Sequence, residues 1–237
     1  ILDGQSPITR LVDKAVADGM RGMAITDHGN MFGIKEFFDY SKSVNKKLKE
    51  EGKEPFKPIF GCEMYVSRYG KKEKKDGKTD MGGYHLIVLA KNSKGYHNLV
   101  KLVSRAWVDG FYMRPRTDHE DLEKYHEGLI VCSACIAGEV PHKILENDIE
   151  GARQSIEWHK RIFGDDYYLE LQRHEVTDPN VRANRETYPL QQKANKILVE
   201  LAREYGVKLV CTNDCHFVDK DNAEAHDHLL CLATGKD

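Results

Sequence analysis

Short apolar runs alternate along the chain with longer segments in which apolar residues recur every three or four positions. The apolar runs, bounded by glycine or polar residues, predict six buried strands at residues 22–26, 58–66, 86–90, 128–132, 167–171 and 207–211. The longer segments predict amphipathic helices at residues 8–18, 31–48, 96–107, 139–147, 149–163, 190–205 and 221–233. Strands that are apolar on both faces and alternate with helices favour an α/β fold with a mainly parallel sheet, closed as a barrel or left open.

A loop rich in basic residues, at positions 68–83, separates the second and third predicted strands. Its basic side chains are Arg68, Lys71, Lys72, Lys74, Lys75 and Lys78. Two interpretations remain open for this loop: a solvated hairpin tip, or a contact with the phosphate backbone of DNA.

Composition narrows the class of protein. The 237 residues carry a formal net charge of −2, so a contact with DNA has to come from a local patch rather than from the whole surface. No apolar stretch approaches the roughly 20 residues of a membrane span, and no signal-peptide pattern is present. We therefore expect a soluble, cytoplasmic protein without a membrane partner. Six cysteines in such a chain favour reduced thiols over a disulfide framework.

Ionisable side chains stand at or near the ends of several predicted strands. They are Asp27 and His28 after the first strand, Glu63 inside the second, His85 before the third, and Asp214 and His216 after the last. Each alone is compatible with a structural role, but an unpaired buried charge costs on the order of several kcal/mol, so together they call for partners. Imidazoles and carboxylates with a thiol nearby suit Zn²⁺, Mn²⁺ or Fe²⁺ better than Mg²⁺, and hydrolysis of phosphate esters is a chemistry that uses several such ions.

Eight segments carry a family resemblance. They are Leu2–Gly4, Ala24–Gly33 (AITDHGNMFG), Gly61–Val66 (GCEMYV), Gly83–Lys91 (GYHLIVLAK), Gly95–Leu99, Gly110–Tyr112, Glu127–Ile130 and Thr212–Phe217 (TNDCHF). In this order, and over essentially the whole chain, they resemble the PHP (polymerase and histidinol phosphatase) domain of bacterial DNA polymerase III alpha subunits.

The resemblance implies a distorted, seven-stranded (β/α) barrel of the PHP type with a metal cluster at its rim. The implied metal ligands are Asp3, His28, Glu63, His85, Cys135, Asp214 and His216. Metal-assisted hydrolysis would rest on Glu63, Asp214 and His216. The resemblance implies that Asp27 orients or charges the site without binding a metal itself, and His174 is a candidate for the pocket wall.

The resemblance also concerns the two ends of the chain. The family begins with a strand that carries a His-x-His pair, and Ile1 lies just downstream of the expected place of that strand. We therefore expect that strand and its two ligands to be missing here, with about two to three Zn²⁺ or Mn²⁺ ions in the intact domain and fewer or none in residues 1–237. Residues 1–237 are expected to form a single PHP domain, with the polymerase domains following in the parent chain.

Three functions remain open. The first is a metal-dependent phosphoesterase, a 3′–5′ exonuclease within a DNA-directed DNA polymerase that acts in DNA replication. The second is a structural platform for the polymerase that also docks a separate proofreading exonuclease subunit. The third is a free-standing enzyme like histidinol phosphatase, against which Gly110–Tyr112 and the other polymerase-like segments speak. The first two imply DNA and the remaining polymerase domains as partners.

Overall fold

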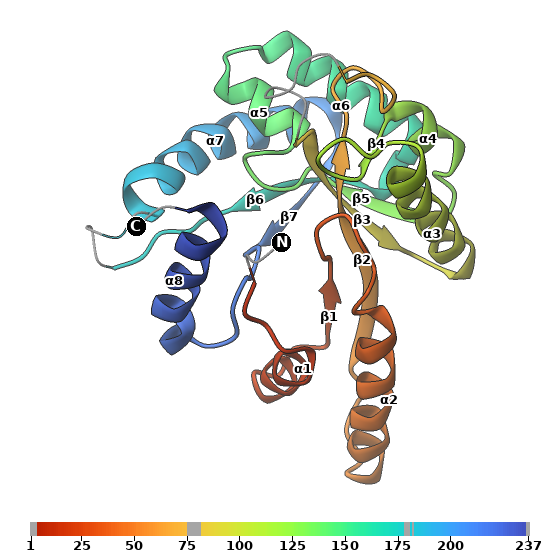
Figure 1. Ribbon diagram of the computed structural model, residues 1–237, viewed down its shortest axis with the longest axis vertical. Helices are drawn as coiled ribbons and strands as arrows, with labels where there is room; N and C mark the ends of the chain where they lie inside the picture. The colour runs from red at the N-terminus through yellow and green to blue at the C-terminus, as the bar shows by residue number, and fades with distance from the viewer. Residues whose placement is uncertain (1–3, 75–81, 178–180, 182, 236–237) are drawn as a thin grey trace. The chain divides into compact units, whose positions relative to one another are not determined.

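The computed structural model describes residues 4–74, 82–177, 181 and 183–235 (Figure 1). Its strands are β1 (Gly22–Ile25), β2 (Lys57–Val66), β3 (Tyr84–Ala90), β4 (Arg116–Thr117), β5 (Leu129–Cys132), β6 (Tyr167–Gln172) and β7 (Lys208–Thr212). Hydrogen bonds join them in the order β1-β2-β3-β5-β6-β7, with β4 paired to β2. The chain divides into two compact units, which are residues 1–25, 32–60 and 214–237, and residues 26–31 and 61–213.

The first unit holds β1, the first four residues of β2 and three α-helices. The helices are α1 (Ile8–Ala17), α2 (Ile34–Glu50) and α8 (Ala223–Thr234), with a 3₁₀ turn η3 (Lys220–Asn222) before α8. β1 and β2 run parallel, and the apolar face of α2 buries Phe37 edge-on against Phe60 with ring centroids 6.0 Å apart. Asn45 on α2 exchanges hydrogen bonds of 2.8 and 2.7 Å with the backbone of Phe56, which anchors the entry to β2.

The second unit holds the rest of the sheet and its connecting helices. These are α3 (Ser93–Val108), α4 (His119–Lys124), α5 (Glu139–Leu145), α6 (Ile149–Phe163) and α7 (Tyr188–Tyr205), with short turns η1 (Gly164–Asp166) and η2 (Ala183–Thr187). The core consists of apolar residues of the strands, such as Val88, Val131 and Leu169, packed with apolar faces of the helices, such as Leu102 and Ile156. No helix among the described residues is long and apolar enough to span a membrane.

The α/β class and all six predicted strands are confirmed, and the sheet is mixed. β3 runs antiparallel to both β2 and β5, whereas the other pairings in the described residues are parallel. The reason is the connection, because the described residues between β2 and β3, 67–74 and 82–83, form no crossover helix, and parallel neighbours need such a crossover. The pattern of apolar residues did not predict β4 or α4.

A close backbone approach fixes α3 against the start of β5. Gly95 lies in the first turn of α3, where the side chain of Asn92 accepts a hydrogen bond of 2.9 Å from its N–H. A Cβ atom on Gly95 would lie 1.7 Å from the carbonyl oxygen of Gly128. That oxygen already accepts a hydrogen bond of 2.9 Å from Lys91 N–H, so the backbone there cannot move aside freely.

We predict that Gly95→Ala lowers the free energy of unfolding by about 1–3 kcal/mol, because the added methyl overpacks this contact. The direction of the change is informative, since replacing glycine by alanine in an unobstructed helix raises the free energy of unfolding by roughly 0.5–1 kcal/mol. Urea unfolding measures the change, and Gly82→Ala is the matched control because a Cβ on Gly82 meets nothing within 4 Å. Equal stability of the two variants would contradict the packing described.

Candidate metal centre

Backbone pairing places His28 beside Glu63. Glu63 lies in the buried second half of β2, and residues 26–31 run alongside it. His28 and Glu63 form a parallel bridge in which Gly29 N–H donates to the Glu63 carbonyl oxygen at 2.9 Å. The N–H of Glu63 donates in turn to the carbonyl oxygen of Asp27 at 3.1 Å. The two side chains therefore leave the sheet next to each other.

The carboxylate of Glu63 is shared between two imidazoles. Its Oε2 lies 2.9 Å from Nδ1 of His28, and its Oε1 lies 2.8 Å from Nδ1 of His85 at the start of β3. The thiol Sγ of Cys135, in the loop after β5, lies 3.6 Å from the same nitrogen of His85. We call His28, Glu63, His85 and Cys135 the Glu63 cluster.

The environment of Glu63 favours its ionised form. Burial alone would raise the pKa of this carboxyl, because its side chain is only 4% exposed. The hydrogen bonds and charges of His28 and His85 outweigh burial and lower the pKa to about 2. An ionised carboxylate is the form that binds a metal ion.

Tyr65 packs against both histidines and was not predicted as part of the site. Its ring lies 6.0 Å from that of His28 in a stacked arrangement and 5.3 Å from that of His85 in an edge-on one. Its hydroxyl accepts a hydrogen bond of 2.8 Å from Arg114. The signal was present in the sequence, because Tyr65 follows Glu63 by two positions on a strand and therefore shares its face.

Gly29 allows the chain to turn directly after His28. Its φ is +65°, and a Cβ there would lie 2.6 Å from Cγ of Pro115 and 3.2 Å from the ring of Tyr65. The indole N–H of Trp107 donates to the Gly29 carbonyl oxygen at 2.8 Å. The glycine after Asp27 and His28 thus permits a close packing that holds the imidazole in place.

The loop that carries Cys135 is held by β6. Ala134 has a φ of +63°, and its N–H donates to Oε2 of the buried Glu170 at 3.1 Å. The N–H of Glu170 donates to the hydroxyl of Ser133 at 2.9 Å. These two bonds fix the backbone immediately before Cys135, so Glu170 positions the thiol although it was not predicted to take part.

Comparison with known proteins identifies the family. The profile of the PHP domain matches residues 1–174. The chain belongs to the PHP domain family. Among its relatives, the DNA polymerase III subunit alpha of Borreliella burgdorferi is 43% identical over 99% of this chain and 19% of that protein. The subunits of Aquifex aeolicus and Thermus aquaticus are 40% and 39% identical over 100% and 98% of this chain, and over 19% and 18% of those proteins. The chain thus spans about a fifth of the length of these relatives.

A solved structure has a similar fold. A protein from Bifidobacterium adolescentis, assigned as a metal-dependent phosphoesterase, superposes with a TM-score of 0.50 at 14% identity. The match covers 97% of this chain and 92% of that one. At this identity the likeness concerns the fold alone.

The remaining ligand positions of the PHP motif lie outside the second unit. Asp214 and His216 belong to the first unit, where Nδ1 of His216 donates to the Asp214 carbonyl oxygen at 2.8 Å and lies 3.9 Å from its Oδ1. Asp214 has a φ of +49°, which few residues other than glycine adopt. Asp3 lies outside the described residues. Their coordination together with the Glu63 cluster stays a prediction.

The two supporting residues of the PHP prediction differ in their surroundings. Asp27 is exposed, and its backbone carbonyl carries the bond to Glu63 described above. His174 uses both ring nitrogens: Nε2 donates to the Asn213 carbonyl oxygen at 2.8 Å, and Nδ1 accepts from Gln191 at 3.0 Å. His174 therefore holds the end of β7, directly before Asp214 in sequence, and leaves no nitrogen for a metal.

The basic loop contains one residue that does not fit its predicted role. Lys71 is 3% exposed, and its ammonium pairs with Asp118 at 3.3 Å and Asp121 at 2.5 Å. Arg116, also buried, donates to the Lys71 carbonyl oxygen at 3.0 Å. Lys71 thus anchors the base of the loop, and a contact with DNA is not open to it.

For the other basic residues of the loop, a contact with DNA stays a prediction. Lys72 and Lys74 are exposed, and Arg68 is half-buried with its guanidinium 4.5 Å from the centre of the Tyr84 ring. Lys75 and Lys78 lie outside the described residues.

The donor set of the Glu63 cluster fits a divalent metal. It offers two imidazoles, an ionised carboxylate and a thiol, which are ligands of Zn²⁺ and related transition metals. The donor atoms of His28, Glu63 and His85 lie within 4.8 Å of one another. The two carboxylate oxygens of Glu63 face different histidines.

We predict a specific acid response in the metal-free chain. Since the pKa of Glu63 is lowered from 4.5 to about 2, its stabilising contribution is present above pH 4.5 and is lost as the pH falls towards 2. The difference in the free energy of unfolding between the wild type and Glu63→Gln should shrink by on the order of 3 kcal/mol across this range. Urea titrations with a chelator at several pH values measure it. A difference that is independent of pH would contradict the ionised, paired carboxylate.

Proposed function

We propose that this chain is the PHP portion of a replicative DNA polymerase alpha subunit, and that it hydrolyses phosphodiester bonds at DNA 3′ ends as a metal-dependent exonuclease. The observation that carries this proposal is the buried Glu63 carboxylate, with each oxygen within 2.9 Å of a different imidazole. The similarity to DNA polymerase III alpha subunits favours this context over a free-standing phosphatase.

The proposed site uses the residues of the chain as ligands. His28, Glu63, His85 and Cys135 would hold the divalent ions, two to three Zn²⁺ or Mn²⁺, together with Asp214 and His216. The ions, when bound, supply the activation of water and the stabilisation of the leaving oxygen. The carboxylate of Glu63 would supply the anionic ligand, and Tyr65 and Gly29 limit the movement of the imidazoles.

A second candidate function is a docking platform for other protein domains. Val108 and Met113 are 83% and 63% exposed, and the rings of Trp107 and Phe111 stack at 5.5 Å beside them. Contiguous exposed apolar surface is typical of protein contacts. This surface supports packing against the remaining polymerase domains or a proofreading subunit, and it is compatible with an active or an inactive metal centre.

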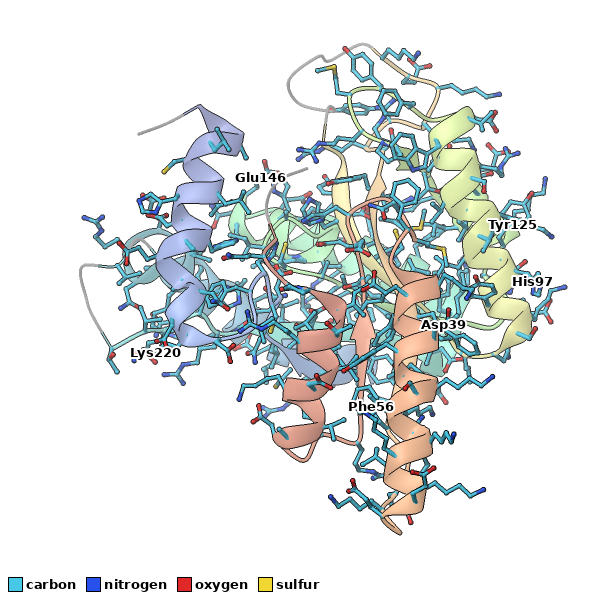
Figure 2. The ribbon with its side chains drawn as sticks, turned by 60° about the horizontal axis from the view of Figure 1, so that its bottom comes forward. Asp39, Phe56, His97, Tyr125, Glu146 and Lys220 are labelled. Atoms are coloured by element: carbon cyan, nitrogen blue, oxygen red, sulfur yellow. The ribbon has the colours of Figure 1, made fainter. Side chains whose placement is uncertain are left out.

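We predict that the complete polymerase subunit removes 3′-terminal nucleotides from single-stranded DNA when Mn²⁺ or Zn²⁺ is supplied. Glu63→Gln and His85→Ala should each lower this rate by about 100-fold or more, because ligand loss weakens metal binding. Primer extension by the same preparations reports that the subunit is folded. His97→Ala is the control, since His97 is an exposed histidine that projects outward from α3 (Figure 2).

Two outcomes separate the candidates. Bound metal without hydrolysis would favour the platform over the exonuclease. Hydrolysis that survives Glu63→Gln unchanged would remove the Glu63 cluster from the reaction.

We further propose that the exposed lysines of the basic loop contact the DNA backbone. The double variant Lys72→Ala/Lys74→Ala should weaken DNA binding equally for all sequences and reduce the slope of log affinity against log salt by about 2. Lys46→Ala/Lys49→Ala removes two exposed lysines of α2 and serves as the control. A salt slope equal to that of the wild type would show that the loop is merely solvated.

A further inference from the structure

A second group of metal-ligand side chains lies in the second unit, apart from the predicted PHP ligands. It consists of His119, Glu139 and His159, which we call the Glu139 cluster, and their donor atoms lie within 4.8 Å of one another. His119 is the first residue of α4, Glu139 is the first residue of α5, and His159 belongs to α6. Three helices distant in sequence thus converge on one point.

The spacing of the first two donors matches that of a shared ion. Nε2 of His119 lies 3.1 Å from Oε2 of Glu139. Two ligands that are each 2.0–2.1 Å from one tetrahedral Zn²⁺ are about 3.3–3.4 Å apart, so both atoms can coordinate the same ion with little movement. The side chain of His119 is 41% exposed, which leaves room for a water molecule as a fourth ligand.

The third donor is oriented by its own helix. His159 is 2% exposed, and both hydrogen bonds it makes within the described residues use Nδ1, to the Ser155 carbonyl oxygen at 2.8 Å and to its hydroxyl at 3.4 Å. Donation from Nδ1 to the carbonyl fixes the tautomer that leaves the lone pair on Nε2. Burial lowers the pKa of His159 to about 4, so the ring is neutral at physiological pH, as a metal ligand must be.

The carboxylate also has the outer contact typical of a metal ligand. Nζ of Lys143, one turn along α5, lies 3.4 Å from Oε1 of Glu139 and leaves Oε2 facing the histidines. Burial alone would raise the pKa of Glu139, but His119 and the neighbouring positive charges lower it to about 2. Ligating carboxylates and imidazoles are usually held by such second contacts.

An ion pair between His119 and Glu139 explains less of this arrangement than a metal site does. It accounts for His119 and Glu139, with the His119 ring stacked on Trp158 at 4.1 Å. It does not account for a fully buried histidine whose protonated nitrogen is bonded away from the carboxylate. A histidine, glutamate, histidine set is a recognised Zn²⁺ ligand set.

We propose that the Glu139 cluster binds one Zn²⁺ ion, separate from the ions of the PHP centre. The ion joins the starts of α4 and α5 to α6. This inference rests on residues other than those of the proposed exonuclease, so either can fail without the other.

The test is the metal content of the complete protein after loading with Zn²⁺ and dialysis. His119→Ala should bind one Zn²⁺ fewer per chain than the wild type, whereas His97→Ala should bind the same number. His119→Gln, which keeps a hydrogen-bonding side chain for Glu139, should also lose one ion. Equal Zn²⁺ content in the wild type and both His119 variants would overturn the proposal.

Thermal unfolding distinguishes a lost ion from a lost ion pair. Zn²⁺ added to the metal-free protein should raise the Tm of the wild type more than that of His119→Ala. If His119→Ala lowers the Tm by the same amount with and without Zn²⁺, the cluster is an ion pair only and the proposal is wrong. Circular dichroism confirms that the variants compared are folded.

Discussion

The buried carboxylate of Glu63 is the constraint on which the candidate centre depends. A carboxylate in the apolar second half of β2 is costly unless it is paired, and the pairing comes from His28 and His85 at 2.9 and 2.8 Å. The parallel bridge to residues 26–31 supplies the first imidazole, and the antiparallel pairing of β2 with β3 supplies the second. The topology around β2 therefore places ligand side chains where a single buried charge requires them.

Partner chemistry distinguishes this carboxylate from other buried acids of the fold. Burial would raise the pKa of Asp121, but Lys71 and Arg105 lower it, and neither of these cations can bind a metal. That network, which also includes Asp118, fixes the base of the basic loop. The partners of Glu63 are imidazoles, which can themselves bind a metal, and Glu139 pairs with His119 in the same way while Lys143 contacts its other oxygen. A buried carboxylate whose partners can themselves bind a metal is suited to a cation that arrives from solution.

The sequence predicted the strands, and it singled out Glu63 and its two histidine partners, because both leave local signals. Apolar runs with polar ends located the six longer strands. Glu63 stood out because it is an ionisable residue inside one of these apolar runs. β4 and α4 were not predicted because a two-residue strand and a six-residue helix are too short to show a periodic pattern of apolar residues. The burial of Lys71 depends on partners some 50 residues away, and a run of lysines otherwise indicates a solvated loop. Cys135 was predicted from the family resemblance alone. The Glu139 cluster was not predicted, because its residues come from three helices and show no common spacing in the sequence.

The central claim is that Glu63, together with His28 and His85, would bind divalent metal ions. Crystals of the complete protein loaded with Zn²⁺ or Mn²⁺ test it through anomalous diffraction at the metal edge. The account predicts anomalous peaks at coordination distance, about 2.0–2.2 Å, from donor atoms of Glu63, His28 and His85. A loaded crystal that shows no peak there, with Glu63 still hydrogen-bonded to both imidazoles, would contradict it.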